Sequence, residues 1–300
     1  MKILVPCDGS KYSKAAIDFI ASRATLIGEN PEVQLLNVQL QVPVRAARLI
    51  GKAAVTDYYA DESKKALRGS LTTLKRAGLT ATSSYAIGHA ADEIARRADS
   101  GAFDLIMMGS HGHGALATLL FGSVTVGVLG RTTRPLLLLR GHGTQPADSL
   151  KVGVAVDGSA YGLAAAKYVL KHRPLFGAAP QFTLLHAVAD LAGSALPELA
   201  GVSLPAAYET DELEAMRQKA FDKAVAPVRK LFAAGGIDAE AVRLTGAAGD
   251  EIASYARKKK LDLLVMGSHG YGAFKSAVLG SVAQRVAAHC STPLLLIREA

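Results

Sequence analysis

The chain has 300 residues, of which 50% are hydrophobic, and carries a formal net charge of +8. This length suits one large domain or two ordinary ones, and the composition leaves ample material for buried cores. No apolar run reaches the roughly 18 residues that a membrane-spanning helix needs. The opening stretch MKILVPCDGS reaches a charged turn too early for a signal peptide. The two cysteines form no disulfide framework, which suits a reducing compartment. We therefore predict a cytoplasmic globular protein without a membrane partner.

The basic excess is spread along the chain. Its densest run, at residues 257–260, lies at a predicted helix end, where cations interact favourably with the final carbonyl groups. Nucleic-acid binding usually adds a basic stripe with stacking aromatic side chains. Because aromatic residues make up only 6% of the chain and tryptophan is absent, nucleic acid is the weaker interpretation of this charge.

An internal repeat organises the sequence. The chain opens with ILVPCDGS and reopens at residue 152 with VGVAVDGS, and residues 103–140 align without a gap on residues 261–298. The protein is therefore an internal duplication. We predict a first domain at residues 1–141, a linker at 142–150 and a second domain at 151–300, each with its own separate five-stranded sheet.

Short apolar runs alternate with helical patterns in each half, which is typical of a parallel α/β sheet. In the first half we predict strands at residues 2–7, 33–39, 80–86, 103–108 and 135–140, and helices at 11–27, 55–77, 90–99 and 122–132. In the second half the predicted strands are 151–156, 181–187, 238–244, 261–266 and 294–298.

A glycine motif occurs once in each half. Residues 109–123 read GSHGHGALATLLFGS and residues 267–281 read GSHGYGAFKSAVLGS. An apolar run precedes each copy and a helical pattern follows it, which places the glycines on a strand-to-helix connection. Glycine lets the backbone approach an anion, and free N–H groups at a helix start point toward negative charge. The pattern indicates a phosphate-binding loop, with a purely structural tight turn as the alternative.

A second repeated loop, DGS, follows the first strand of each half. Ligands of parallel sheets bind beyond the carboxyl ends of the strands, so this loop and the glycine loop are expected to meet there. Asp8 and Asp157 can hydrogen-bond a ribose or a base edge, or they can cap the following helix, and the sequence leaves both roles open. The loop histidines His111 and His269 are not expected to bind a metal: His113 adds a histidine in the first copy only, and no cysteine or acidic ligand lies close in sequence.

These motifs resemble the universal stress protein family in its tandem two-domain form. The resemblance rests on the spacing G-x2-G-x9-G-S, on DGS, and on the ending GSV followed by PLLL, and it covers nearly the whole chain. It implies two doubly wound α/β domains, each a five-stranded parallel sheet of order 3-2-1-4-5 with helices on both faces, and ATP binding. For the first site it implies Pro6, Asp8, Val38, Met108, Gly109, Gly112, Gly122, Ser123 and Val124. For the second site it implies Asp157, Ala187, Met266, Gly267, Gly270, Gly280, Ser281 and Val282.

Two departures bear on the second site. Ala155 stands where the first half has Pro6, and Ala187 stands where it has Val38. We therefore expect the second site to bind more weakly. The leucine-rich last strands, residues 136–140 and 294–298, are predicted to lie at a sheet edge and to mediate pairing. An apolar edge strand that stays unpaired invites aggregation. The resemblance implies that they pair the halves as an intrachain pseudo-dimer or pair two chains as a homodimer.

The function that follows is nucleotide binding rather than efficient catalysis. The lysine of a G-x4-G-K-[ST] loop is absent. Residues that would stabilise charge and position a nucleophile for phosphoryl transfer are not recognisable. We therefore assign no catalytic or metal-ligating residue. We expect ATP, or else ADP or AMP, with Mg²⁺ held through the phosphates, to act as a conformational or assembly signal in a stress response. A regulatory protein partner of unknown identity is implied. The alternatives are a slow ATPase or phosphotransferase, and a nucleotide-free interaction scaffold.

Overall fold

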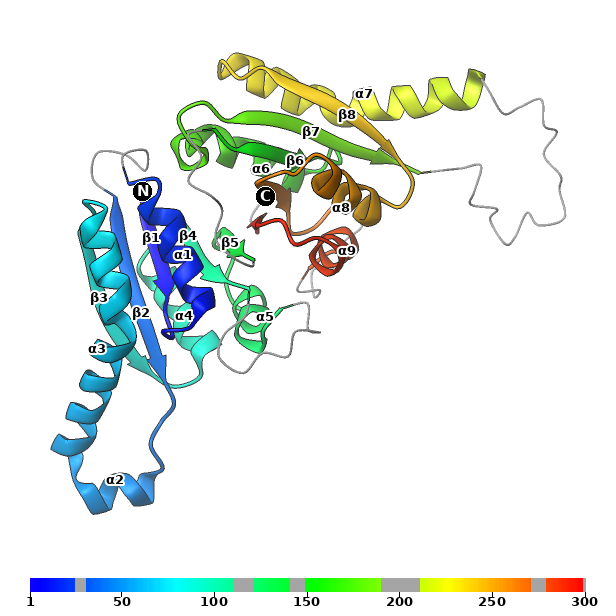
Figure 1. The fold of residues 1–300 in the computed structure, drawn as a ribbon. Coiled ribbons are helices and arrows are strands. Elements are labelled where there is room, and N and C mark those ends of the chain that lie inside the picture. Colours follow the sequence, from blue (N-terminus) through cyan, green and yellow to red (C-terminus); the bar gives the residue numbers. More distant parts are fainter. Residues whose placement is uncertain (25–30, 111–120, 141–148, 190–210, 271–278, 299–300) are drawn as a thin grey trace, which may run out of the picture.

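The computed structural model describes residues 1–24, 31–110, 121–140, 149–189, 211–270 and 279–298. Strands and helices follow one another in the predicted order (Figure 1). The elements of the first half are β1 (Lys2–Pro6), α1 (Lys11–Ala21), β2 (Glu32–Gln39), α2 (Val44–Ile50), α3 (Lys52–Arg76), β3 (Ala81–Ile87), α4 (Ala90–Ser100), β4 (Leu105–Gly109), α5 (Ser123–Leu129) and β5 (Leu136–Leu139). Those of the second half are β6 (Lys151–Ala155), α6 (Ala160–Lys171), a 3-10 turn (Arg173–Phe176), β7 (Gln181–Val188), α7 (Asp211–Ala234), β8 (Ala239–Thr245), α8 (Ala248–Lys258), β9 (Leu263–Gly267), α9 (Ser281–His289) and β10 (Leu294–Ile297).

The ten strands of the described residues form one sheet of order β3-β2-β1-β4-β5-β10-β9-β6-β7-β8. The first half shows the predicted order 3-2-1-4-5, and the second half repeats it in its own strand numbering. Strands within a half pair in parallel, whereas β5 and β10 pair antiparallel, with Leu137 opposite Leu295. The prediction that the last strands pair the halves is confirmed. The expectation of two separate sheets was wrong, because pairing these two apolar edges fuses the sheets.

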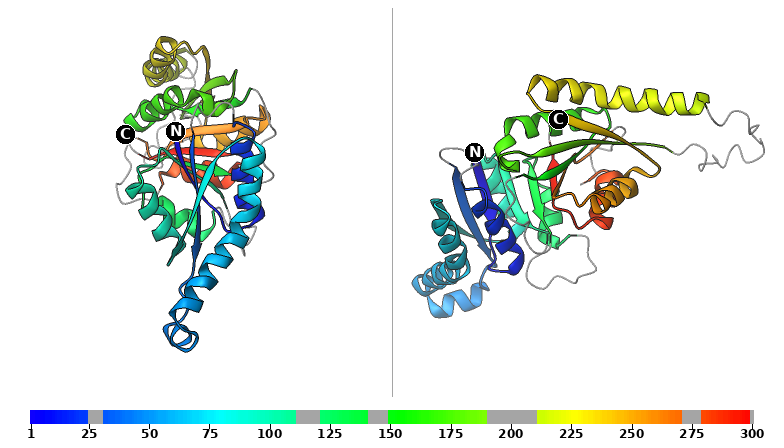
Figure 2. Two further views of the ribbon diagram at one scale, coloured as in Figure 1. Left: turned by 90° about the vertical axis from the view of Figure 1, so that its left-hand side faces the viewer. Right: turned by 45° about the horizontal axis from the view of Figure 1, so that its top comes forward.

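Helices cover both faces of the sheet, and two hydrophobic cores result (Figures 1 and 2). One core gathers side chains of α1, α3, α6 and α7, such as Phe19 and Phe232. The other gathers side chains of α4, α5, α8 and α9, such as Ile94 and Val286. Strands that are covered on both faces must be apolar throughout, and every residue of β4, β5, β9 and β10 is accordingly buried.

Local structure departs from the sequence prediction at a few places. The short helix α2 was not predicted, since none of its residues is buried and the chain therefore shows no apolar periodicity there. It ends at Gly51, whose φ of +85° suits glycine. Residues 142–148 of the predicted linker lie outside the described residues, while Leu150 is fully buried. No helix in the described ranges is both long enough and apolar enough to cross a bilayer.

Two arginines cross the seam between the halves. Arg140 follows β5 and donates from Nη1 to the backbone carbonyls of Ala287, at 2.7 Å, and Cys290 near the end of α9. In the repeat register Arg298 is its counterpart, and its Nε donates to the Thr132 carbonyl at 3.3 Å. Burial lowers the pKa of both guanidinium groups. The pseudo-symmetric pair thus ties each last strand to the helix end of the other half.

A second pair of contacts flanks the seam. In the first half the Arg23 guanidinium lies 3.9 Å from the centre of the Phe19 ring, and in the second half His172 stacks on Tyr168 with ring centres 4.4 Å apart. The Tyr168 hydroxyl also reaches the carbonyl of Asp104 in the first half, at 3.4 Å. These side chains occupy matching positions of α1 and α6, so the same backbone position carries a permanent cation in one half and a titratable ring in the other.

We predict that His172 makes the fold sensitive to mild acid. Burial, and next the charge of Lys171, hold the pKa of His172 below its ordinary value, while Asp104 opposes this in part. As the pH falls through about 6.5, the unfolded chain binds the proton before the folded chain does, so stability is lost. Urea unfolding should show that the free energy of unfolding falls less between pH 7.5 and pH 5.5 for His172→Gln than for the wild type. The exposed His289→Gln serves as control, and an equal effect of both replacements contradicts the prediction.

Candidate functional site

The DGS loop is a turn held by its aspartate. Oδ1 of Asp157 accepts the backbone N–H of Ser159 at 2.9 Å and its hydroxyl at 2.6 Å, around Gly158 with a φ of +79°. The Ser159 hydroxyl in turn accepts the N–H of Gly162 at 3.2 Å and so caps α6. The cap is therefore the serine, and the capping alternative for Asp157 was wrong.

The same arrangement recurs in the first half. Oδ1 of Asp8 accepts the N–H of Ser10 at 2.9 Å, and Ser10 caps α1 by accepting the N–H of Ser13 at 3.3 Å. Each aspartate thus uses one carboxylate oxygen to fix its turn. The consequence is a carboxylate of fixed orientation at the carboxyl end of the first strand of each half.

The glycine loop of the second half is anchored at both of its ends. The N–H of Ser268 donates to the Ile297 carbonyl at 2.8 Å, and the N–H of Gly280 donates to the Ser268 carbonyl at 2.8 Å. Ser268 is fully buried, and its hydroxyl lies 2.9 Å from Nδ1 of His269. These bonds bring the strand end at β9 and the helix start at α9 together.

The glycine loop and the DGS loop meet at Gly270. A β-carbon built on Gly270 would lie 2.5 Å from Oδ2 of Asp157, which is closer than any real contact. Any other side chain would have to displace this carboxylate, whereas glycine leaves room for it. The prediction that the two loops meet beyond the strand ends is confirmed in the second half.

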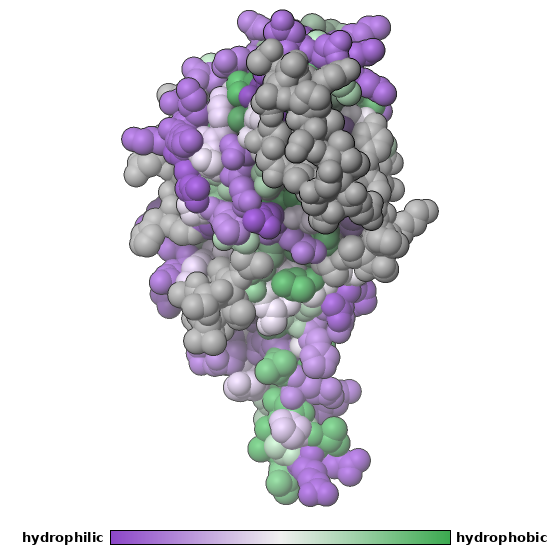
Figure 3. Space-filling view, turned by 90° about the vertical axis from the view of Figure 1, so that its right-hand side faces the viewer, coloured by the Kyte–Doolittle hydropathy of each residue, from purple (hydrophilic) through white to green (hydrophobic). Residues whose placement is uncertain are grey.

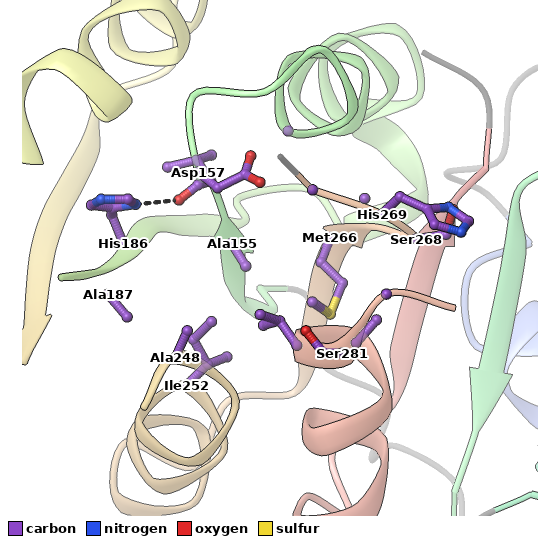
Figure 4. Close-up of a pocket in the computed structure, with 17 residues that line it drawn as sticks. Ala155, Asp157, His186, Ala187, Ala248, Ile252, Met266, Ser268, His269 and Ser281 are labelled. Atoms are coloured by element: carbon purple, nitrogen blue, oxygen red, sulfur yellow. Dashed lines mark hydrogen bonds between the residues drawn. The ribbon is translucent and has the colours of Figure 1, made fainter. Parts of the chain in front are cut away.

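A pocket of about 300 Å³ opens where these loops meet (Figure 4). It lies at the carboxyl ends of β6, β7 and β9 and at the starts of α8 and α9, as expected for a parallel sheet. All eight residues that the sequence analysis assigned to the second site line it, together with others that it did not assign. The lining residues are Ala155, Val156, Asp157, Gly162, His186, Ala187, Ala248, Ile252, Met266, Gly267, Ser268, His269, Gly270, Gly280, Ser281, Val282 and Ala283.

The start of α9 gives this pocket an electropositive side. Gly280 is the N-cap residue and supplies no side chain to cap the first N–H groups, and the first turn holds no acidic residue. Ser281 and Val282, the first two residues of the helix, line the pocket and are exposed. Uncapped N–H groups and the helix dipole together favour an anion at this position.

His186 is the pocket residue that the sequence analysis most clearly missed. Its Nδ1 lies 2.7 Å from the Val156 carbonyl oxygen and, facing an acceptor, donates to it. The matching residue of the first half, Asn37, donates from Nδ2 to the Cys7 carbonyl at 2.8 Å. The duplication places Asn37 and His186 in register, and this alignment was the signal that could have identified the position.

The described parts of the first site repeat this architecture. The N–H of Gly122 donates to the Ser110 carbonyl at 2.9 Å, and Gly122 is the N-cap of α5 without a side-chain cap. Met108 and Gly109 end β4, Pro6 ends β1 and Val38 lies in β2. Asp8, Ser123 and Val124 follow in the positions that match the second half, while Gly112 lies outside the described residues. Burial raises the pKa of Cys7 to about 12, so this thiol beside Asp8 is a poor nucleophile.

Comparison with known proteins agrees with this architecture. The model of the universal stress protein family matches residues 1–140 and again residues 149–298. The chain belongs to the universal stress protein family. The family membership predicted from the glycine and DGS motifs is thereby confirmed, in the tandem form.

Similar family members come from bacteria and archaea. A universal stress protein of Mycolicibacterium smegmatis is 24% identical over 302 residues, which cover 99% of this chain and 96% of that protein. YxiE of Bacillus subtilis is 30% identical over 147 residues, which cover 46% of this chain and 98% of that protein. The crystal structure of a universal stress protein from Archaeoglobus fulgidus superposes with a TM-score of 0.68 over 100% of this chain and 98% of that one, at 21% identity. At this identity the superposition supports the fold alone.

We predict that the first glycine of each motif is required for stability. A β-carbon on Gly267 would lie 2.6 Å from Cβ of Tyr161, and one on Gly109 would lie 2.5 Å from the Tyr12 carbonyl oxygen. Replacing either glycine by alanine should lower the free energy of unfolding by about 2 kcal/mol, since strand and helix must separate. Gly69 on α3 has no neighbour near its Cβ position, so Gly69→Ala should instead stabilise the protein by about 0.5 kcal/mol. Urea denaturation measures all three, and equal stabilities would contradict the prediction.

Proposed function

We propose that this protein is a cytoplasmic universal stress protein that binds an adenine nucleotide, and that the nucleotide acts as a conformational or assembly signal. The observation that carries the proposal is the second-half pocket, where the uncapped start of α9 faces the carboxylate of Asp157 across Gly270. The uncapped helix start gives an anion a place to bind. The Asp157 carboxylate gives a hydroxyl-bearing sugar a hydrogen-bond acceptor.

The lining of the pocket fits such a ligand in two parts. Ala187, Ile252 and Met266 supply apolar surface for a base, and Ser281 stands at the helix start where phosphates would rest. The volume of about 300 Å³ is at the lower end of the range for small-molecule sites. Within the described ranges no group of three histidine, cysteine or acidic side chains could hold a metal ion. Mg²⁺ would therefore be held chiefly by the phosphates themselves.

Binding is favoured over turnover by what lines the pocket. Among its described lining residues there is neither lysine nor arginine. Phosphoryl transfer depends on charge stabilisation by such groups together with a positioned nucleophile. A slow ATPase is therefore the second candidate. The nucleotide-free scaffold is disfavoured because Gly270 and the uncapped helix start are both retained.

The first test places a negative charge where the phosphates would rest. Ser281→Asp in the second half and Ser123→Asp in the first should each remove one binding site, because the carboxylate repels phosphate. The same carboxylate at a helix N-terminus favours the fold, so loss of binding cannot be blamed on unfolding. Isothermal titration with ATP and Mg²⁺ should give two sites for the wild type, one for each variant and none for the double variant.

The matched control for this test is Ser281→Ala, which removes the hydroxyl without adding charge and should change affinity only a few-fold. ATP binding that survives in the folded double Asp variant would show that the phosphates do not rest at these helices. In that case the scaffold function would replace the proposed one.

A nucleotide signal needs a route out of the pocket, and α9 offers one. Its first turn lines the pocket, and the carbonyls of Ala287 and Cys290 near its end accept Nη1 of Arg140 from the first half. Arg140 follows β5, where the Leu139 carbonyl accepts the N–H of Ser110, at 2.9 Å. The Ser110 carbonyl accepts the N–H of Gly122, also at 2.9 Å, at the start of α5. We propose that Arg140 couples the two nucleotide sites.

Amide hydrogen exchange tests this coupling in protein whose first site is blocked by Ser123→Asp. ATP bound in the second half should slow exchange in α5 as well as in α9. Adding Arg140→Gln should abolish the effect on α5 while ATP still protects α9. Arg134→Gln, which removes an exposed contact to Asp99 instead, is the control and should change neither. Equal protection of α5 with and without Arg140 would disprove the coupling.

A further inference from the structure

β3 lies at one end of the ten-stranded sheet and has β2 as its single strand neighbour among the described residues. The N–H of Gly88, just after β3, bonds the Gln39 carbonyl of β2. Because backbone N–H groups alternate in direction along a strand, those of Ser83, Tyr85 and Ile87 point away from β2. The outer side of β3 therefore presents a row of strand-pairing groups, the usual template for an added strand.

A groove runs between β3 and α3. Two adjoining cavities, of about 410 and 650 Å³, share Tyr85 and are both lined by residues of α3 and β3. Tyr85 is 38% exposed and Ile87 is 41% exposed. The projecting end of the molecule near α2 also carries apolar side chains beside charged ones (Figure 3), among them Leu49 at 87% exposure. Apolar exposure of this kind marks an interaction surface.

The second half shows what closes such a groove. There, Arg243 of β8 donates to Glu214 and Gln218 of α7 and so bridges strand and helix. In the repeat register the first half has Tyr85 in place of Arg243, Thr56 in place of Glu214 and Ala60 in place of Gln218. None of these side chains can form that bridge. The first half therefore lacks the bridge between strand and helix, here called the clasp, that the second half has.

The rim of the groove is basic. Arg48, Lys52 and Arg68 line the two cavities, and within the described part of the chain none of their side chains has an ion-pair partner. Lys64 and Lys65 lie on the same rim and are paired with acids of α3, at 3.6 and 2.6 Å. The fitting occupant is thus an extended segment with acidic groups for the rim and apolar side chains for the groove.

We propose that β3 binds an extended acidic and apolar segment of a partner protein, which pairs along its outer edge as an eleventh strand. Main-chain hydrogen bonds to Ser83, Tyr85 and Ile87 give affinity, and the groove beside Tyr85 gives specificity, as in β-strand addition elsewhere. A second copy of this chain is a poor occupant when it meets the same surface, because the two basic rims would repel each other. This surface is distinct from the nucleotide site, and the proposal does not depend on it.

The test uses the full chain and a fluorescein-labelled heptapeptide with three central valines and two glutamates at each end, with binding measured by fluorescence polarisation. We expect binding that weakens as salt rises. N-methylation of alternate peptide residues in the register that faces β3 should weaken binding at least about tenfold. N-methylation in the other register should not. An equal effect of both registers would mean that no strand is added.

The decisive variant introduces the clasp of the second half into the first half. Thr56→Glu together with Tyr85→Arg leaves the net charge unchanged and should weaken peptide binding at least about tenfold while the thermal unfolding curve stays the same. Arg48→Gln with Lys52→Gln should weaken binding about fivefold, since exposed cations near opposite charges each contribute modestly. The control Lys223→Gln with Lys230→Gln on α7 removes the same charge and should have no effect.

The proposal is overturned by absence of peptide binding, or by unchanged binding in the folded clasp variant. It is also overturned if light scattering shows a concentration-dependent dimer that the clasp variant dissolves, because β3 would then pair with a second copy.

Discussion

The antiparallel pairing of β5 with β10 is the contact on which the rest of the molecule depends. Each strand is a run of buried apolar residues, and neither could remain at a bare sheet edge without exposing both its side chains and its unpaired backbone groups. Joining them buries both edges at once. It also sets α5 and α9 beside the seam, where Arg140 and Arg298 each reach the helix end of the other half.

One consequence is that β3 and β8 remain as the outer edges of the sheet, and the contacts of these two strands with their neighbouring helices differ. The β8 edge is bridged to α7 by Arg243, whereas the matching position in β3 is Tyr85, which cannot form that bridge. The halves also differ near the ends of β7 and β2, where His186 and Asn37 make equivalent bonds to a backbone carbonyl with different side chains. The two halves therefore share their backbone arrangement, while single side chains give each half its own properties.

The glycines of the motif have different physical roles, and the two interpretations of the motif are not exclusive. Gly267 and Gly109 are needed because a strand end passes against the start of a helix, at Tyr161 and Tyr12. Gly270 is needed because the loop passes the carboxylate of Asp157. The first role is structural, and the second keeps the pocket and its acidic group together.

The sequence by itself determined the family, the duplication and the order of most elements, and it named eight residues that together line the pocket of the second half. These follow from local signals: apolar runs and helical periods for the strands and helices, and glycine and serine at fixed spacing for the loop. The sequence did not predict α2, because an exposed seven-residue helix has no buried face to create a period. It also left open whether Asp8 and Asp157 bind a ligand or cap the following helices, and it did not identify Ser10 and Ser159 as the caps. Only the tertiary structure decided which oxygen accepts which N–H, placed His186 in the pocket, and showed that the two sheets are one. Such facts depend on distances between segments far apart in the chain, and a local pattern carries no information about those distances.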